Sequence, residues 1–431
     1  MIQMIKKDCF RRTEIFPETV EQKEITNAVR SILEDVKLRG DTAVKYYTKT
    51  FDHVEILDTL VENPIAIAKG AETADPAFLA ALSRAAENIF HFHEKQKQTG
   101  YAIQECDGII TGQRVIPLKT VGIYVPGGTA RYPSTVLMNC IPAKLAGVEN
   151  IVITTPPDSE GNVPPQILAA AHVAGANYII KAGGAQAIAA LAYGTESVPR
   201  ADKIVGPGNA YVAEAKRQVQ GIVDTDMIAG PSEILIVADG KNNPEITAMD
   251  LLSQAEHDKM ATAVLITDDE AFARHVAEAL ERAIPSLPRK EIARASIDRN
   301  GKIIITSSIR SAIEAANEIA PEHLELCVDH PFDYLSLIRN AGSVFLGRNC
   351  PEALGDYYAG PNHTLPTGGT ARFSSPLSVE DFVKKSAYTY YTAEALEKAC
   401  KDIVTIAEEE GLHAHGRSVS LRCGSFGNTV K

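Results

Sequence analysis

Two polar side chains with the chemistry of metal ligands, Gln254 and His257, lie three residues apart. Asn243-Pro244 is a good helix start, and it predicts a helix that runs to about Asp258. Residues three apart share one face of a helix, so an amide oxygen and an imidazole could reach the same cation. Glutamine is an unusual zinc ligand. A polar helix end with a hydrogen-bonded histidine therefore remains the alternative.

Three other segments combine an acid with a histidine. These combinations are Glu322 with His323, Asp356 with Asn362 and His363 in a glycine-rich loop, and Glu410 with His413 and His415. Each has an ordinary structural explanation: Asp356 could cap a turn, for example, and His363 could donate a hydrogen bond to a buried carbonyl. One assembled site explains all of them together better than separate accidents do. Glutamine, histidine and aspartate ligands suit a borderline divalent cation such as zinc.

Glycine-rich turns follow three of the apolar segments. They are Tyr124-Val125-Pro126-Gly127-Gly128, Gly183-Gly184-Ala185-Gln186 and Gly206-Pro207-Gly208-Asn209. A strict GxGxxG motif is absent, which weakens a dinucleotide assignment. Such turns can bring backbone N–H groups up to an anionic ligand, although tight turns alone would explain much of the pattern.

The elements that must position these residues alternate between strand and helix. Unbroken β-branched runs predict strands within 121–126, 151–157, 177–184, 203–209, 234–239, 261–267, 302–306 and 343–347, with helices between them. This alternation is typical of parallel α/β sheets that are buried on both faces. Residues 22–100 have helical periodicity. Thr392 and Glu394 begin a further helix that ends near Gly411.

Composition excludes several classes of protein. The 431 residues carry a net charge of -12, with no basic block that would bind nucleic acid. No apolar run of about 20 residues could span a membrane. The beginning of the sequence lacks the apolar stretch of a signal peptide, so we expect a cytoplasmic location. Seven scattered cysteines are interpreted as free thiols.

The ordered motifs resemble those of the histidinol dehydrogenase family over roughly residues 20–425. The segments that carry the resemblance are VGIYVPGG, STVLMNCIPAKLAGV, GGAQAIAALAYGT, VGPGNAYVAEAKRQV, AGPSEILIVAD, LLSQAEHD, APEHLEL, ALGDYYAGPNHTLPT and EGLHAHGRSVSLR. The resemblance implies an oxidoreductase of histidine biosynthesis. It would oxidise L-histidinol to L-histidine through L-histidinaldehyde in two NAD-dependent steps, as a homodimer with one zinc per subunit and a shared active site.

The resemblance also implies a role for individual residues. It assigns the zinc to Gln254, His257 and Asp356 of one subunit and to His415 of the second subunit. His415 is favoured over His413 because the family pattern places the ligand in an Ala-His pair, here Ala414-His415. Glu322 and His323 match the acid–base residues. Ser232, His363 and Glu410 match substrate positions, together with Gln254, His257, His323, Asp356 and His415. Tyr124, Gln186 and Asn209 match NAD contacts. Pro361 stands where the family often has threonine.

The fold that the resemblance implies is an intertwined homodimer with two incomplete Rossmann-like domains in each chain. We expect an N-terminal arm at 1–21, a larger discontinuous α/β domain at 22–122 and 235–373, an inserted domain at 123–234, and a helical dimerisation segment at 374–431.

In the expected mechanism zinc positions the substrate, His323 is the base, and Glu322 activates water in the second step. A zinc hydrolase is the alternative enzyme. A metal-dependent amino-acid-binding protein is the non-enzymatic alternative.

Overall fold

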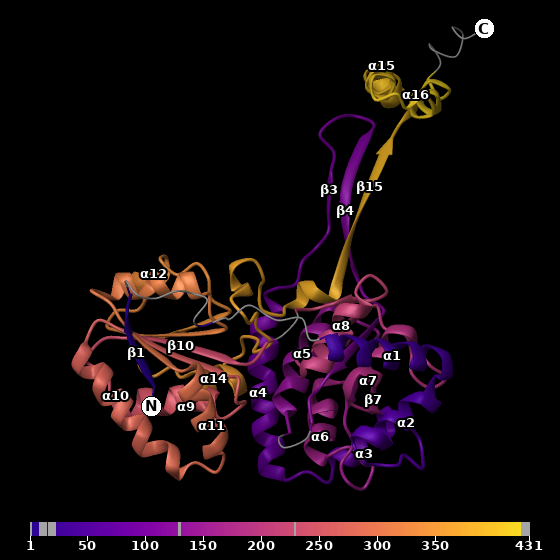
Figure 1. Cartoon of the computed structure of the whole chain (residues 1–431). Helices are drawn as coiled ribbons and strands as arrows, with labels where there is room; N and C mark the ends of the chain where they lie inside the picture. The colour runs from indigo at the N-terminus through magenta and orange to yellow at the C-terminus, as the bar shows by residue number, and fades with distance from the viewer. Residues whose placement is uncertain (1, 8–14, 16–22, 128–130, 228–229, 424–431) are drawn as a thin grey trace. The chain divides into compact units, whose positions relative to one another are not determined.

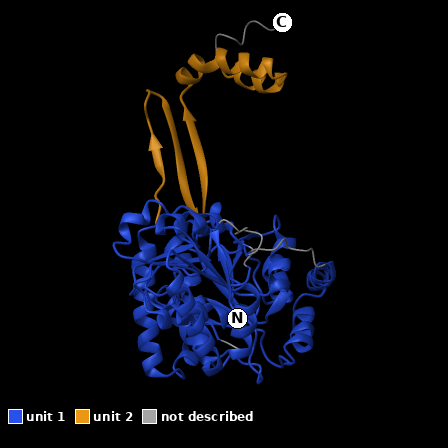
Figure 2. Ribbon diagram, turned by 60° about the vertical axis from the view of Figure 1, so that its left-hand side comes forward, with its two compact units in different colours: residues 1–96, 118–382 blue, residues 97–117, 383–431 orange. Residues whose placement is uncertain are grey.

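The structure is a computed structural model that describes residues 2–7, 15, 23–127, 131–227 and 230–423. Cys9, Gly128 and most of the predicted N-terminal arm lie outside the described residues. The chain forms two compact units, one of residues 1–96 and 118–382 and another of residues 97–117 and 383–431 (Figure 2). We call them unit 1 and unit 2.

The first sheet of unit 1 has the strand order β2-β7-β6-β5-β8-β9. Its strands are β2 (Val61–Glu62), β5 (Thr120–Tyr124), β6 (Asn150–Thr155), β7 (Tyr178–Lys181), β8 (Lys203–Val205) and β9 (Asp224–Thr225). All pairings are parallel except that of β2 with β7. The strands predicted within 121–126, 151–157, 177–184 and 203–209 are thereby confirmed, although the last two end earlier than these ranges, at Lys181 and Val205.

Helices cover both faces of this sheet (Figure 1). They are α1 (Lys23–Arg39), α2 (Asp41–Phe51), α3 (Pro64–Ala71), α4 (Pro76–Glu94), α5 (Pro133–Ala146), α6 (Pro165–Ala174), α7 (Gly184–Tyr193) and α8 (Ala210–Val219). Ile151 and Ile153 face the core of α3–α6, whereas Val152 between them faces the core of α1, α2, α7 and α8. Successive side chains of a strand point to opposite faces, so a continuous apolar run fills both cores.

The packing of α1–α4 corrects the predicted grouping of 22–122 with 235–373. These helices bury their apolar sides in the two cores of the first sheet, and β5 is a strand of that sheet. Helical periodicity shows that a helix has a buried face, but it does not identify the sheet against which that face packs.

The second sheet of unit 1 is entirely parallel, with the order β1-β12-β11-β10-β13-β14. Its strands are β1 (Gln3–Lys6), β10 (Glu233–Ala238), β11 (Thr262–Thr267), β12 (Lys302–Ile305), β13 (His323–Cys327) and β14 (Ser343–Leu346). Its helices are α9 (Pro244–Ala255), α10 (Glu270–Ala283), α11 (Lys290–Asn300), α12 (Ile309–Ile319), α13 (Phe332–Leu335) and α14 (Glu352–Tyr357). Part of the predicted arm is thus an edge strand.

Both sheets are wound in the same way. In the first sheet β6 and β7 extend to one side of β5, and β8 lies on its other side. In the second sheet β11 and β12 extend to one side of β10, and β13 lies on its other side. Each sheet therefore has a topological switch point, next to which ligands of open α/β sheets bind at the carboxyl ends of the strands.

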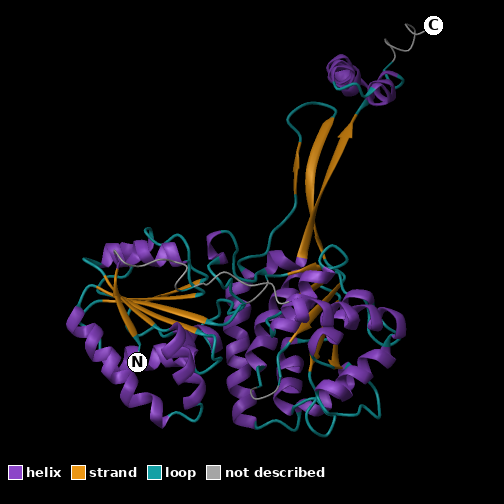
Figure 3. Ribbon diagram, viewed as in Figure 1, coloured by secondary structure: helices purple, strands orange, loops and turns teal. Residues whose placement is uncertain are grey.

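Unit 2 combines a three-stranded antiparallel sheet with two helices (Figure 3). Its elements are β3 (Tyr101–Ile103), β4 (Ile109–Pro117), β15 (Val383–Tyr391), α15 (Ala393–Glu409) and α16 (His413–Ser420). The predicted start of α15 is confirmed, because Thr392 caps it by accepting a hydrogen bond from Ala395 N–H. The three strands were not predicted. Among the described residues, no helix is long and apolar enough to cross a membrane.

Candidate active site

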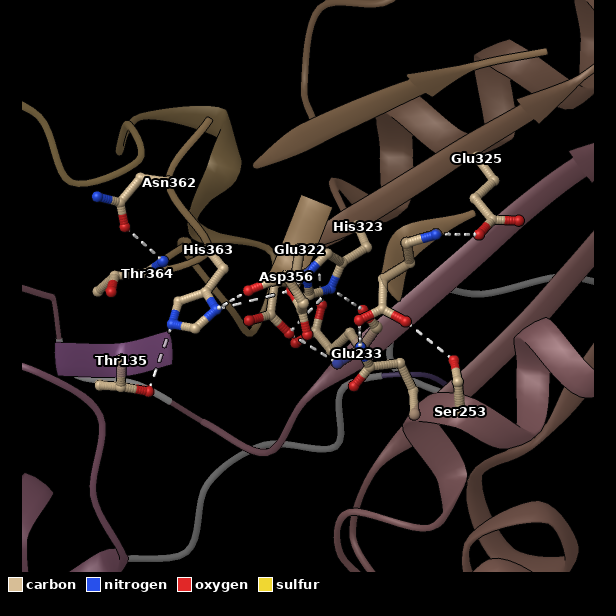
Figure 4. A network of polar contacts seen from close by, with 12 residues as sticks. Thr135, Glu233, Ser253, Glu322, His323, Glu325, Asp356, Asn362, His363 and Thr364 are labelled. Atoms are coloured by element: carbon tan, nitrogen blue, oxygen red, sulfur yellow. Dashed lines mark hydrogen bonds and ion pairs between the residues drawn. The ribbon is translucent and has the colours of Figure 1, made fainter. Parts of the chain in front are cut away.

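Glu322 and His323 lie at the amino end of β13, where the chain bends sharply after α12. Ala320 has a left-handed backbone, with φ of 57°, and Pro321 follows it. Both side chains are buried, and His323 Nδ1 lies 3.6 Å from Glu322 Oε2 (Figure 4). Successive residues of a regular strand would point to opposite faces. The bend before β13 lets these two share one site, as Pro321 predicted.

A second buried acid, Glu233, holds this pair in place from the amino end of β10. Glu233 N–H donates to Glu322 Oε2 over 2.8 Å, and Glu322 N–H donates to Glu233 Oε2 over 3.3 Å. His323 Nδ1 lies 2.9 Å from the carbonyl oxygen of Glu233. A carbonyl only accepts, so Nδ1 carries a proton. In the neutral ring, Nε2 is then the basic nitrogen.

Burial controls the charges of these groups. Burial raises the pKa of Glu322 to about 7. Burial also raises the pKa of Glu233, and with the added effect of the negative charge of Glu322 that pKa is about 8. Burial alone would lower the pKa of His323, but Glu322 and Asp356 outweigh it and raise that pKa to about 10. Removal from water penalises the charged form, whereas an opposite charge stabilises it.

Asp356 lies on α14 rather than in the predicted glycine-rich loop, which begins after it. Its Oδ1 is 3.5 Å from His323 Nε2 and 3.9 Å from His363 Nδ1. Burial would raise the pKa of Asp356, but the neighbouring His323 and His363 reverse the effect and lower it. His363 Nε2 also lies 3.3 Å from the hydroxyl of Thr135 on α5. Asp356 is thereby an anionic group between two imidazoles.

Gln254 and His257 approach from the end of α9. The helix ends at Ala255 rather than near Asp258, so His257 lies in the following turn, with its N–H donating to the carbonyl of Gln254 over 3.0 Å. Gln254 is 1% exposed, and its Nε2 donates to Glu352 Oε1 over 2.5 Å. Its Oε1 is buried and accepts no hydrogen bond from the described residues.

The arrangement can hold a cation. Ligand atoms of His323, Glu352 and Asp356 all lie within 4.8 Å of one another. The carboxylate of Asp356 acts on the pKa of His257, although burial is the larger effect and lowers that pKa. The unpaired Gln254 oxygen supplies a further donor, because a buried amide oxygen without a partner is otherwise costly. These groups fit a site of oxygen and nitrogen donors.

Not all predicted residues meet here. His415, in the first turn of α16, and Glu410, which ends α15, are exposed residues of unit 2. Ser232 precedes β10 and is half-buried, and its carbonyl accepts a hydrogen bond from Thr262 N–H over 3.0 Å.

The three predicted NAD residues follow strands of the first sheet. Tyr124 ends β5, and its hydroxyl accepts a hydrogen bond from Gly184 N–H over 3.1 Å. Gln186, in the first turn of α7, is 1% exposed, and its Oε1 has no hydrogen-bond partner among the described residues. Asn209 caps α8 by accepting hydrogen bonds from the N–H groups of Tyr211 and Val212. Tyr124 and Asn209 lie on either side of the switch point between β5 and β8.

An ion-pair network lies next to the corresponding switch point of the second sheet. Arg348 Nη2 binds both carboxylate oxygens of Asp239, each over 2.7 Å, and its Nη1 binds Asp329 over 2.7 Å. These two acids follow β10 and β13, the strands that flank that switch point. Hydrogen bonds between a guanidinium group and a carboxylate are charge-assisted and stronger than neutral ones.

Comparison with known proteins identifies the family. The family model for histidinol dehydrogenase matches residues 17–423. The chain belongs to the histidinol dehydrogenase family. It is 54% identical to the histidinol dehydrogenase of Bacillus thuringiensis subsp. konkukian (strain 97-27) over 410 residues, 95% of this chain and 94% of that protein. The crystal structure of histidinol dehydrogenase from Elizabethkingia anophelis has a TM-score of 0.92 at 39% identity, over 99% of each chain.

Membership of the histidinol dehydrogenase family confirms the predicted oxidoreductase of histidine biosynthesis and the mixed α/β fold. It gives no support to the zinc hydrolase. Sequence reasoning missed Glu233 and Glu352, although each had a signal. Glu233 is an acid that begins an apolar strand, and Glu352 precedes Asp356 by four residues, the spacing of one helical turn.

Proposed function

We propose that this protein oxidises L-histidinol to L-histidine through L-histidinaldehyde, passing one hydride to NAD in each of two steps. The observation that carries the proposal is the buried group of Glu322, His323 and Asp356, in which the His323 Nδ1 proton is held by the Glu233 carbonyl. Water enters the second step as a reactant. The balance is one histidinol, two NAD⁺ and one water to one histidine, two NADH and three protons.

Zinc is the metal that we propose for this site. Gln254 Oε1, His257 and Asp356 would hold it, and the unpartnered buried amide oxygen supports this assignment. When bound, zinc supplies an open coordination position that orients the nitrogen donors of histidinol.

His323 performs the proton transfer of the first step. Neutral His323 accepts the hydroxyl proton at Nε2 as the hydride leaves the alcohol carbon for NAD, which produces the aldehyde and NADH. Because the pKa of His323 is raised to about 10, the neutral ring is the minor form near neutral pH, so this step should accelerate as the pH rises toward 10. The Glu233 carbonyl fixes the ring through Nδ1, so that Nε2 keeps its direction toward the site. Ser232, His363 and Glu410 are proposed to contact the substrate.

Glu322 performs the proton transfer that is specific to the second step. Water adds to the aldehyde carbon and gives one proton to the Glu322 carboxylate, while His323 returns the proton taken in the first step to the carbonyl oxygen, which forms the aldehyde hydrate and leaves His323 neutral. His323 again accepts a hydroxyl proton as the hydride leaves for a second NAD, and the carboxylic acid that forms loses its proton to give the carboxylate. Burial supports this role, because a carboxyl group with a pKa of about 7 can accept and return a proton near neutral pH.

NAD is proposed to bind at the switch point between β5 and β8. The amino end of α7 carries no side-chain cap, whereas Asn209 already caps α8. The amino end of a helix attracts a pyrophosphate, so we place it at the start of α7, where Gly184 N–H already donates to the Tyr124 hydroxyl. Two side-chain atoms remain available for the rest of the cofactor. They are Gln186 Oε1, which is buried and has no partner among the described residues, and the amide nitrogen of Asn209, whose oxygen caps α8.

A second copy of the chain is proposed to complete the site. Unit 2 exposes apolar side chains on its sheet and helices, including Tyr101, Tyr390, Ile406 and Leu421. Large exposed apolar surfaces of this kind are typical of interfaces. We propose that the chain forms a homodimer in which His415 is the fourth zinc ligand of the opposite subunit's site.

The proposal is tested by adding L-histidinol and NAD to the purified protein and recording NADH absorbance. We expect two NADH for each histidinol and loss of the signal after treatment with a chelator, with recovery on adding zinc. A hydrolase or a binding protein would produce no NADH. Histidinol consumption without NADH would overturn the proposal.

A further inference from the structure

A buried ion pair adjoins the proposed NAD site. Lys216 on α8 reaches back to the turn that precedes its own helix, and its ammonium group pairs with Asp226 just after β9. Both side chains are 2% exposed. Removing two charges from water costs several kcal/mol per ion even when they pair, and apolar replacement of such a pair is often neutral or stabilising. Stability alone is therefore a weak reason for this pair.

The pair holds both backbone polar groups of Gly206. Gly206 N–H donates to Asp226 Oδ2 over 2.7 Å, and Lys216 Nζ donates to the Gly206 carbonyl over 3.0 Å. Gly206 has a φ of 110°, and a Cβ there would lie 2.2 Å from the carbonyl oxygen of Tyr124. The turn thus lies directly against the end of β5. These two buried side chains fix Gly206, which follows the end of β8 and begins the proposed cofactor turn.

Lys216 is unsuited to bind a phosphate itself. An ammonium group has three protons, and its three acceptors are Asp226 Oδ1, the Gly206 carbonyl and the Met227 carbonyl, the last at 3.1 Å. The neighbouring carboxylate also cancels its charge. Any effect on NAD must therefore act through the position of the turn.

We infer that Lys216 and Asp226 are positioning residues for NAD, which hold the Gly206–Asn209 turn in its binding conformation. The inference rests on the proposed function and goes beyond it by assigning cofactor affinity to a pair that does not touch the cofactor. A turn that is ordered before binding loses less conformational freedom when the ligand arrives, and this increases affinity.

Lys216→Met, measured beside Lys203→Met as a matched control, tests the inference. Lys203 is also buried, and it pairs with Asp224 over 3.1 Å and Asp381 over 3.2 Å. It begins β8, at the opposite end of the strand from Gly206. The dissociation constant of NADH is measured by its fluorescence, alongside melting temperature, zinc content and the KM for histidinol.

We expect Lys216→Met to weaken NADH binding about tenfold or more, with the KM for histidinol changed less than about twofold. Lys203→Met should lower the melting temperature without changing NADH binding. Equal NADH affinities in the two variants would overturn the inference. A wild-type protein that makes no NADH from histidinol would instead contradict the proposed function.

The double variant Lys216→Met/Asp226→Leu covers the case in which the single variant fails to fold through its unpaired buried carboxylate. We expect it to fold and still bind NADH weakly, because the apolar pair fills the space without holding Gly206. If this double variant bound NADH as tightly as the wild type, or failed to fold, the ion pair would serve stability and not cofactor binding. Either result would overturn the inference.

Discussion

At the scale of single residues, the site depends on how burial divides work among nearby carboxyl groups. Glu322 has a pKa of about 7, whereas Asp356 is held in the charged form by its two imidazole neighbours. Environments that separate the pKa values of similar groups are how one site obtains both a proton acceptor and a fixed negative charge. This division makes the two steps separable by substitution.

Glu322→Gln should slow the oxidation of histidinaldehyde about a hundredfold or more and that of histidinol much less. The amide cannot take a proton from water, but only the second step needs this transfer. His323→Asn should slow both steps while zinc content stays normal. Rates are measured as NADH formation from each substrate in turn. Equal losses of both oxidations in Glu322→Gln would refute the assignment.

Glu325 makes protein stability dependent on pH. Burial and the charge of Asp250 raise its pKa from 4.5 to about 8. A raised pKa means that the folded state binds the proton more tightly than the unfolded state does. The stability that this proton contributes is therefore full below pH 4.5 and is lost as the pH rises through about 8. Its contribution to the free energy of unfolding should fall by at most about 1.4 kcal/mol per pH unit in that range.

Glu325→Gln keeps the shape of the protonated acid and cannot ionise. The free energy of unfolding of the variant minus that of the wild type should therefore be larger at pH 9 than at pH 5. The measurement is the free energy of unfolding of both proteins across this range. A constant difference between them would show that Glu325 is not protonated in the folded state.

At the scale of elements, α14 positions two acids for different tasks. Glu352 and Asp356 are one turn apart, and Glu352 binds Gln254 Nε2 on α9. This contact decides which end of the amide faces the proposed zinc. Because the Nε2 donor is engaged, the Oε1 acceptor is left for the metal.

Glu352→Leu should therefore weaken zinc binding about 10- to 100-fold, the usual effect of losing a residue that orients a metal ligand. Competition with a chelator of known affinity measures this directly. Ser253→Ala is the control, because Ser253 Oγ donates to the other oxygen of Glu352 over 2.9 Å and leaves the Gln254 contact intact. Similar zinc affinities in the two variants would contradict the orienting role.

The sequence predicted eight strands of the two parallel sheets, because unbroken apolar runs are local signals, but it did not predict β1, β2, β9 or β13. The adjacent Glu322 and His323 are also a local signal, and the structure places both side chains in one buried group. The sequence could not predict which sheet α1–α4 cover, since that depends on packing between distant segments. For the same reason it missed Glu233, whose role exists only because β10 pairs with β13. It also missed β4 and β15, which lack an unbroken apolar run: most side chains of β4 are half-buried, and nearly all those of β15 are exposed.

At the scale of the whole molecule, the proposed dimer places His415 of one chain in the other chain's site. A His257→Ala chain and a His415→Ala chain should each be inactive alone. Mixed dimers would rebuild one of their two sites, so random mixing should recover about one quarter of wild-type activity. The measurement is NADH formation after the two chains are refolded together.

The matched control mixes His257→Ala with Asp356→Asn, two changes that damage the same half of the site. No mixed dimer of these chains contains an intact site, so activity should stay near zero. Recovery in the control, or none in the first mixture, would contradict the shared site.

The pairing of β15 with β4 also orders events during synthesis of the chain. Val383 pairs with Pro117 and Tyr391 with Ile109, so the two strands are separated along the chain by all strands of both parallel sheets except β1 and β2. Unit 2 consequently cannot form until almost the whole chain has left the ribosome, whereas the first sheet of unit 1 is complete much earlier. Pairings between such distant segments form late. The surface proposed to meet a second subunit would thus become available only after the catalytic body can fold, which keeps unfinished chains from associating.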